Sequence, residues 1–306
     1  MKNNKRKFYF GVILLALFVI GVGCAERPER VKQKKKKRVG PNADLPADRD
    51  EFQRRVSELR KQLPEDVFTI IVQPPFVIIG DEEPGGVERR ARKTVKWTVD
   101  MLRKAYFPRL PDRIIDVWLF KDRESYREHC RSLFHIEPGT PFGFCSREYG
   151  LIMNVATGGG TLVHEIVHPF VEANFPECPA WFNEGLASLY EQCGERGGRI
   201  VGFTNWRLAG LQKAIGRDSL GSFKRLTDMS ALEFYGEGSG LNYAQARYLC
   251  YYLQEKGVLR KFFKKWTART EADPTGYETL KSVLSTDDME RFQNEWEDYV
   301  MSLHFP

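Results

Sequence analysis

The stretch Thr-Leu-Val-His-Glu-Ile-Val-His-Pro-Phe-Val, residues 161–171, is an apolar run with helical spacing that carries the motif His-Glu-Ile-Val-His at 164–168. Histidines at positions i and i+4 lie on one helix face, with Cβ atoms about 5–6 Å apart. Both imidazoles can therefore reach one tetrahedral zinc ion, which binds nitrogen ligands at about 2.0–2.1 Å. Glu165 projects about 100° around the helix from His164, beside the ion. A carboxylate in that position can act as a general base toward water.

A third candidate ligand comes sixteen residues after His168. Glu184 lies in Trp-Phe-Asn-Glu-Gly-Leu-Ala, residues 181–187, a second segment with helical character. Two histidines and one glutamate leave a fourth zinc position open for water or substrate. The HExxH pattern is short enough to arise by chance, but polar side chains in an apolar helix would otherwise be buried unfavourably. The sequence therefore predicts a Zn²⁺ site of His164, His168 and Glu184.

These residues resemble the gluzincin metallopeptidases, in which two histidines and a downstream glutamate bind zinc and the glutamate of HExxH is the base. Residues 179–187 (PAWFNEGLA) are similar to the Pro-x-Trp-Phe-x-Glu-Gly-x-Ala pattern of bacterial putative peptidases in this MA-like superfamily. The resemblance covers about residues 145–255. It implies the same three ligands, with Glu165 as the catalytic base. It also implies an α+β fold: a lobe with a small mixed sheet and the zinc helix, then a mainly helical lobe.

The resemblance further implies a hydrogen-bond donor to the oxyanion of the tetrahedral intermediate, on a helix beyond the third ligand. Tyr243 lies in Asn-Tyr-Ala-Gln, 59 residues after Glu184, and is similar to that position. Tyr235 is a rival for this role, and a tyrosine that only packs in the core is a further alternative. We therefore predict Glu165 and Tyr243 as catalytic residues, with the choice of tyrosine left open.

One residue does not fit a straight zinc helix. Pro169 directly follows His168. Proline disfavours the helical conformation of the residue before it, and its ring clashes with the carbonyl group four residues back, that of Glu165. We therefore expect a kink or the end of the helix here, with His168 binding from a final or bent turn.

The net charge of +6 is unevenly distributed along the 306 residues. Residues 1–40 hold 12 Lys and Arg against 2 Asp and Glu, which leaves 35 and 39 for the rest of the chain. The body is therefore slightly acidic and has no polybasic module of the kind that binds nucleic acid. With 42% apolar residues it has ample material for a core. We expect no nucleic-acid partner.

The N-terminal segment has the pattern of an export signal. Basic residues precede an apolar stretch of sixteen residues, 8–23, which ends at Cys24. A membrane-spanning helix needs about 20 residues, so this length suits the core of a signal peptide. Gly-Val-Gly-Cys resembles a bacterial lipobox, with Gly21 where leucine is usual, and makes Cys24 the candidate lipidation site. Lipoprotein, uncleaved anchor and secreted protein stay open, and each places the body outside the cytoplasm of a bacterium.

Residues 25–49 are predicted to form a basic, disordered tether, because Lys-Gln-Lys-Lys-Lys-Lys-Arg at 32–38 cannot bury a face. This run either lies against anionic headgroups of a membrane or is a solvated spacer. Beyond Cys24 there are five cysteines, an odd number that leaves at least one thiol free. Cys178 and Cys193 flank Glu184, and they either brace its segment or are isolated buried thiols.

Hydrophobic periodicity places the elements along the body. An α+β lobe with the zinc site is expected over 50–200 and a helical lobe over 201–306. If the strand at 150–155 is a sheet edge, an extended peptide could pair with it and lie across the zinc; the alternative is a fully paired strand. Helices are predicted over 49–63, 88–106, 125–134, 241–255, 259–266 and 289–303, and strands over 68–72, 76–80, 114–120, 142–145 and 150–155.

These features together predict an extracytoplasmic zinc metallopeptidase that acts on a peptide or protein substrate and is held to a membrane by an N-terminal lipid or anchor, or is secreted. One alternative is a non-catalytic cell-envelope protein that retains a zinc peptidase fold for binding or structure. Another is a zinc hydrolase of non-peptide amides. Glu165 favours an enzyme, because a binding module has no need of that carboxylate.

Overall fold

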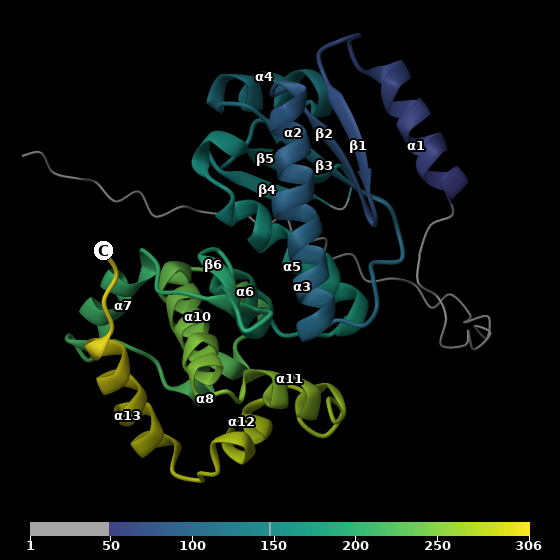
Figure 1. The fold of residues 1–306 in the computed structure, drawn as a ribbon. Helices are drawn as coiled ribbons and strands as arrows, with labels where there is room; N and C mark the ends of the chain where they lie inside the picture. Colours follow the sequence, from purple (N-terminus) through teal and green to yellow (C-terminus); the bar gives the residue numbers. More distant parts are fainter. Residues whose placement is uncertain (1–48, 147) are drawn as a thin grey trace, which may run out of the picture.

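The computed structural model describes residues 49–146 and 148–306 (Figure 1). The predicted export signal, Cys24 and all of the tether except its last residue lie outside the described residues. An α+β part with a mixed sheet is followed by a mainly helical part, and the two occupy the upper and lower halves of the view. This arrangement confirms the predicted fold class. Within the described ranges, no helix is both long and apolar enough to cross a membrane.

A five-stranded mixed sheet forms the centre of the N-terminal part. Its spatial order is β1-β2-β3-β5-β4, in which β2, β3 and β5 run parallel and the edge strands β1 and β4 are antiparallel to their neighbours. Phe76 pairs with Ile115 across β2 and β3, and Val117 pairs with Leu151 across β3 and β5. The strands are β1 (Thr69–Gln73), β2 (Phe76–Gly80), β3 (Ile115–Phe120), β4 (Gly143–Ser146) and β5 (Gly150–Asn154).

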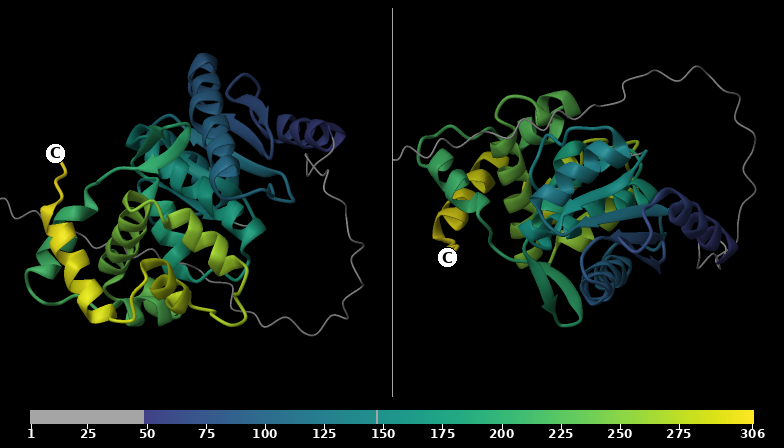
Figure 2. Two further views of the ribbon diagram at one scale, coloured as in Figure 1. Left: turned by 60° about the horizontal axis from the view of Figure 1, so that its bottom comes forward. Right: turned by 90° about the horizontal axis from the view of Figure 1, so that it is seen from above.

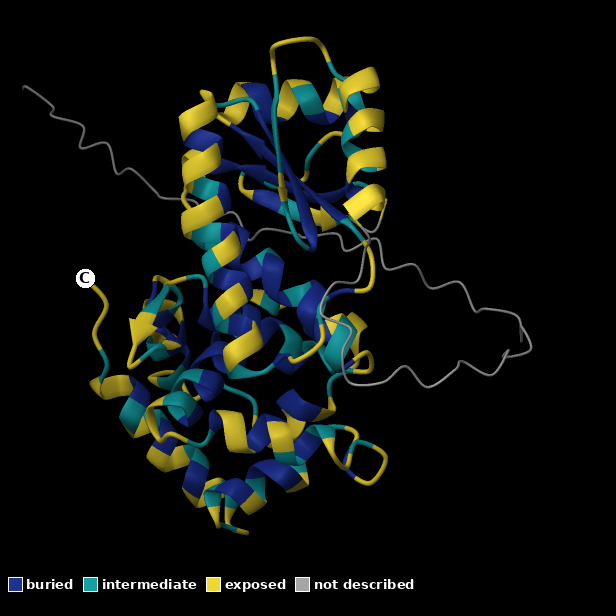
Figure 3. Cartoon of the chain, turned by 45° about the vertical axis from the view of Figure 1, so that its right-hand side comes forward, coloured by how far each residue is buried: buried dark blue, intermediate teal, exposed yellow. Residues whose placement is uncertain are grey.

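Both faces of this sheet are buried, because its three parallel strands are apolar at nearly every position. Helices α1 (Arg49–Gln62) and α4 (Arg123–Phe134) cover one face. The other face packs against α5 (Gly160–Asn174) and a long helix of three consecutive parts. The dark strands between helices with exposed outer faces are visible in Figure 3, and the layers in Figure 2. The three parts are α2 (Pro84–Arg90), the π-helical η1 (Ala91–Lys96) and α3 (Trp97–Ala105).

The C-terminal part begins with the helix that follows α5 and contains one short hairpin. A 3₁₀ turn, η2 (Val155–Thr157), precedes α5. After α5 come α6 (Ala180–Leu189) and the hairpin of β6 (Cys193–Arg196) and β7 (Arg199–Gly202). The remaining helices are α7 (Arg207–Ile215), α8 (Phe223–Asp228), α9 (Ala231–Tyr235), α10 (Ser239–Glu255), α11 (Leu259–Thr267), α12 (Tyr277–Leu284) and α13 (Met289–Ser302).

Aromatic stacking fixes α6 against α11. The ring of Trp181 stacks on that of Trp266 with centroids 5.6 Å apart, and the ring of Phe182 stacks on that of Phe263 at 5.9 Å. Such pairs add roughly 0.5–1.5 kcal/mol each beyond the burial of their area. These rings belong to one apolar core that continues from the sheet to α13.

At two places the structure excludes one of the alternatives that the sequence left open. Strand β5 is not a sheet edge, because it pairs with β3 on one side and β4 on the other, so β4 is the edge strand. Helix α5 does not end at Pro169 but continues to Asn174. Proline removes one backbone donor, and the neighbours Val167 and Phe170 are fully buried, so packing keeps the chain helical. The predicted elements otherwise lie close to their expected bounds. The β6–β7 hairpin and the helices α7, α8, α9 and α12 were not given ranges from the sequence.

Candidate metal centre

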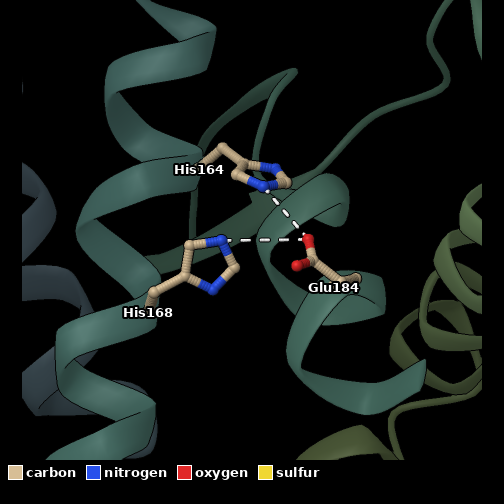
Figure 4. A group of neighbouring side chains, drawn as sticks. All are labelled: His164, His168 and Glu184. Atoms are coloured by element: carbon tan, nitrogen blue, oxygen red, sulfur yellow. Dashed lines mark ion pairs between the residues drawn. The ribbon is translucent and has the colours of Figure 1, made fainter. Parts of the chain in front are cut away.

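Two neighbouring helices bring the three predicted ligands together, as Figure 4 shows. His164 and His168 lie one turn apart on α5, with ring centroids 4.9 Å apart. Glu184 projects toward them from α6. His164 and Glu184 are buried, and His168 is half-buried. Among the described residues, this is the one group of His, Cys, Asp or Glu whose ligand atoms all lie within 4.8 Å of one another.

The spacing of the three atoms suits a metal ion. Oε2 of Glu184 lies 3.3 Å from Nε2 of His164 and 3.8 Å from Nε2 of His168. Ligands about 2.0–2.1 Å from a tetrahedral zinc ion are about 3.3–3.4 Å apart. This oxygen is buried and receives no hydrogen bond from any described group. A buried acceptor without a donor destabilises a protein by about 1–3 kcal/mol, and a bound cation would satisfy it.

The second nitrogen of each imidazole faces an acceptor. Oδ1 of Asn183 lies 3.0 Å from Nδ1 of His168. Oε1 of Glu191 lies 3.2 Å from Nδ1 of His164, although this contact lacks the alignment of a full hydrogen bond. With the proton on Nδ1, each ring turns the lone pair of Nε2 toward Glu184. Metal-binding histidines almost always have such an acceptor behind them, so both rings have the orientation that a metal site requires.

Glu191 is itself held from two sides. Arg207 donates to both of its oxygens, with Nη2 at 2.8 Å from Oε1 and Nε at 3.1 Å from Oε2, and Asn205 donates to Oε2 at 3.1 Å. Such a bidentate guanidinium–carboxylate pair is among the stronger polar contacts in proteins. On the other side, a Cβ at Gly160 would lie 2.2 Å from the backbone oxygen of Glu191. The first residue of α5 therefore rests directly on the backbone of Glu191, and any larger side chain would force the two apart.

The two tyrosines considered from the sequence occupy different positions. Tyr235 donates a hydrogen bond of 2.7 Å to Oε1 of Glu184, which leaves Oε2 for the histidines. Tyr243 lies beside it, with its ring centroid 6.3 Å from that of Tyr235 and 5.2 Å from that of Phe234. The Tyr243 hydroxyl forms no hydrogen bond within the described chain. Tyr235 thus supports the third candidate ligand, and the catalytic role of Tyr243 stays a prediction.

Glu165 is half-buried at the edge of this cluster. Its carboxylate forms no hydrogen bond with any residue that the structure describes. Burial raises its pKa, and the nearby His164 and His168 oppose this effect. The Glu165 side chain therefore lies close to the histidines without forming a hydrogen bond to them.

The charges of the cluster depend strongly on one another. Burial alone would raise the pKa of Glu184, but His168 and His164 lower it to about 2. Burial alone would lower the pKa of His164, but its contacts with Glu184 and Glu191 raise it to about 10. The three side chains are therefore electrostatically coupled, and a metal ion that binds there would compete with protons for the same nitrogen and oxygen atoms.

A pocket of about 230 Å³ borders the candidate centre. His168 and Asn183 line it, together with the apolar side chains of Ile115, Leu151 and Phe175. His164, Glu165 and Glu184 do not, so the pocket meets the cluster only at His168 and at the residue behind its ring.

Comparison with known proteins assigns the chain to no family. No protein-family model matches it, and no curated protein is similar to it. The gluzincin resemblance therefore depends on the sequence motifs alone. The structure supports the coarser statement that His164, His168 and Glu184 form a buried cluster that could bind a metal ion.

Sequence reasoning missed the residues behind the histidines. Asn183 directly precedes Glu184 on the same helix, so its place in the sequence indicates that it lies near the cluster. Glu191 follows the end of α6, and no sequence pattern links it to His164. Cys178 and Cys193, considered as a brace for Glu184, are free thiols.

Proposed function

We propose that this protein is a zinc-dependent metallopeptidase of the gluzincin type. The observation that carries the proposal is the buried Oε2 of Glu184, which has no donor among the described groups and faces Nε2 of both histidines. Two imidazole nitrogens and one carboxylate oxygen suit zinc, and three protein ligands are typical of catalytic sites. His164, His168 and Glu184 would hold the ion.

The side chains around the ligands support a hydrolytic mechanism. When bound, the zinc ion would supply a Lewis acid that activates water and polarises the scissile carbonyl. Glu165 would accept a proton from the attacking water and deliver it to the leaving amine. Tyr243 would donate a hydrogen bond to the developing oxyanion. Asn183 and Glu191 would keep the imidazoles in orientation.

Metal analysis tests the site itself. Purified protein is expected to contain about one zinc ion per chain, and His164→Ala is expected to lose most of it, because three ligands become two. His304→Ala is the matched control, since this exposed histidine lies at the end of the chain, outside the cluster. Stoichiometric zinc in His164→Ala would contradict the ligand assignment.

Activity toward peptides tests the reaction. A diverse peptide library is expected to be cleaved, and a chelator is expected to stop the cleavage. Glu165→Gln is expected to keep the metal and lose activity, because an amide cannot accept the proton. Cleavage at the wild-type rate by Glu165→Gln would rule out this residue as the base. Tight peptide binding without turnover would instead favour a non-catalytic binding protein, and turnover of non-peptide amides alone would favour a different hydrolase.

We also propose that the protein acts outside the cytoplasm, attached to a membrane through Cys24 or the apolar segment 8–23, or secreted. The support is the basic start, the apolar stretch and the lipobox-like sequence. The composition of the 26 residues from Cys24 to Arg49 predicts a flexible coil, and a coil of that many residues has a root-mean-square length of roughly 25–30 Å. An attached protein would therefore meet substrates close to the membrane.

A further inference from the structure

A second cavity, an open groove of about 600 Å³, lies where the two parts of the chain meet. It is lined by the end of α3 and the loop after it, by Asn174 at the end of α5, and by one face of α11. None of the candidate metal ligands lines it. Four basic side chains do, and no acidic one. The four are Arg109, Arg260, Lys261 and Lys264.

These four side chains, which we call the basic groove residues, are exposed and have no ion-pair partner among the described residues. Unpaired exposed cations also occur elsewhere among the described residues, as do paired ones: Arg131 lies 2.5 Å from Glu137, and Arg291 lies 2.9 Å from Glu295. The four basic groove residues differ because they gather around one groove whose lining holds no acidic side chain. The body as a whole is slightly acidic, so a general excess of charge does not explain the cluster. Like charges around one groove repel each other unless an anion compensates them.

Hydrogen bonds fix the guanidinium of Arg260 and the backbone of Arg109. Nε of Arg260 donates to the carbonyl of Ala105 at 3.0 Å, which leaves both terminal nitrogens of the guanidinium free of this contact. The amide of Asn174 holds the backbone of Arg109 by accepting from its N–H at 3.0 Å and donating to its carbonyl at 2.7 Å. The guanidinium of Arg260, held in this way, presents a planar fork that matches two oxygens of one anionic group.

Tyr106 connects the lining of the groove to the core. Tyr190 donates a hydrogen bond of 2.9 Å to the hydroxyl of Tyr106, which lines the groove. Tyr190 is fully buried, so this bond holds the loop after α3 in place. Helix C-termini carry a partial negative charge that attracts cations. This charge accounts for Arg109 at the end of α5, Arg260 on the last carbonyl of α3 and Lys264 in the last turn of α11. It does not account for Lys261, or for the lack of any acidic side chain in the lining.

We propose that the groove binds a ligand with several phosphate oxygens, in the form of a di- or triphosphate ester or a phosphorylated lipid headgroup. Four cations around one confined space match a group that carries several negative charges in a small volume. The carboxylates of an acidic peptide are spread along a chain and match it less well. The proposal is independent of the peptidase proposal, because it uses none of the metal cluster.

Binding of tripolyphosphate to the full chain, measured by titration calorimetry near physiological salt, tests the site. The double variant Lys261→Glu/Lys264→Glu is expected to bind at least about tenfold more weakly, because two attractive charges become repulsive. The matched control is Lys93→Glu/Lys213→Glu, which makes the same change of net charge at two exposed lysines outside the groove. It is expected to stay within about twofold of the wild type. The basic N-terminal segment is common to all three proteins and cancels in the comparison.

The outcomes separate the sources of the ligand. Vesicles of phosphatidylcholine with and without phosphatidylglycerol form the second arm. If Lys261→Glu/Lys264→Glu loses binding to both tripolyphosphate and the phosphatidylglycerol vesicles while the control does not, the ligand is a lipid headgroup. If it loses binding to tripolyphosphate alone, the ligand is a soluble phosphate ester. Equal binding by this variant and the control would overturn the proposal. So would groove-dependent binding of polyglutamate without binding of tripolyphosphate. Thermal denaturation of both variants checks that they are folded.

Discussion

The hydroxyl of Tyr235 donates a hydrogen bond of 2.7 Å to Oε1 of Glu184, while Oε2 of the same carboxylate faces the two histidines. The two oxygens therefore have separate partners. The carboxylate cannot rotate without breaking the bond to Tyr235, so this tyrosine is a positioning residue for the candidate metal ligand.

Tyr235→Phe is expected to weaken zinc binding about 10–100-fold, the range found when a partner behind a metal ligand is removed. Competition with a chromophoric chelator measures the change. Tyr243→Phe is the matched control, because it removes a hydroxyl from the neighbouring ring that has no bond to Glu184. It is expected to keep the zinc affinity and to lower the rate of peptide cleavage. Equal zinc affinities in the two variants would remove Tyr235 from the metal centre.

Glu191→Gln is expected to lower zinc affinity by about tenfold, because the amide keeps the size of the side chain but loses the charge that faces His164 and Arg207. The same chelator competition measures it. Glu195→Gln, at an exposed position in the neighbouring hairpin, is the control and is expected to be unchanged. If both variants bind zinc like the wild type, Glu191 does not orient His164.

Gly160→Ala is expected to destabilise the protein by about 1–3 kcal/mol, the usual effect of an added methyl group that overpacks a tight contact. The new Cβ would lie 2.2 Å from the backbone oxygen of Glu191. Gly159→Ala is the control, because a Cβ there meets no atom within 4 Å. Thermal denaturation of the metal-free proteins separates this effect from metal binding. Equal melting temperatures of the two variants would show that the backbone of Glu191 can shift to make room for the methyl group with little loss of stability.

The buried thiols are expected to resist modification in the folded protein. Burial raises the pKa of Cys130 to about 12, and partial burial does the same for Cys193, which is half-buried. The thiolate is the reactive form, so a raised pKa leaves very little of it at pH 8 and more as the pH rises toward 12. Labelling followed by mass spectrometry should find Cys130 modified only after unfolding. Cys145, which is exposed, is expected to react in the native state, and Cys145→Ser identifies its signal. Rapid native labelling of Cys130 would contradict this prediction.

Cys24→Ser tests the proposed attachment in a bacterial host. If a lipid on this cysteine holds the protein, the variant is expected to be released from the membrane fraction or to accumulate as an unprocessed precursor. Immunoblotting of membrane and soluble fractions shows both outcomes. Unchanged size together with unchanged membrane association would point to an uncleaved apolar segment at 8–23.

Local patterns predicted much of this fold and site. The apolar strands β2, β3 and β5 were visible because both faces of each are buried, and the i, i+4 histidines required only a helix to share a face. The pairing of β4 with β5 was also predictable, because the two strands are neighbours in the sequence and form a hairpin. The full strand order was not, since the parallel pairing of β3 with β5 depends on contacts between distant parts of the chain. The β6–β7 hairpin has a sequence signal in the adjacent glycines Gly197 and Gly198. Both residues have the positive φ that tight hairpin turns require. Glu191 had no such signal, because only tertiary folding places it behind His164.

The stacking of α6 on α11 limits how this site can change during evolution or engineering. Trp181 and Phe182 are anchored in the aromatic core, and the next two residues, Asn183 and Glu184, serve the metal cluster. Four consecutive residues of α6 therefore meet two different requirements: core packing for the first two and the geometry of the metal cluster for the last two. A substitution that repacks the core here would also move a ligand, so mutations that tune the metal affinity without loss of stability are expected on the hairpin and α9 rather than on α6.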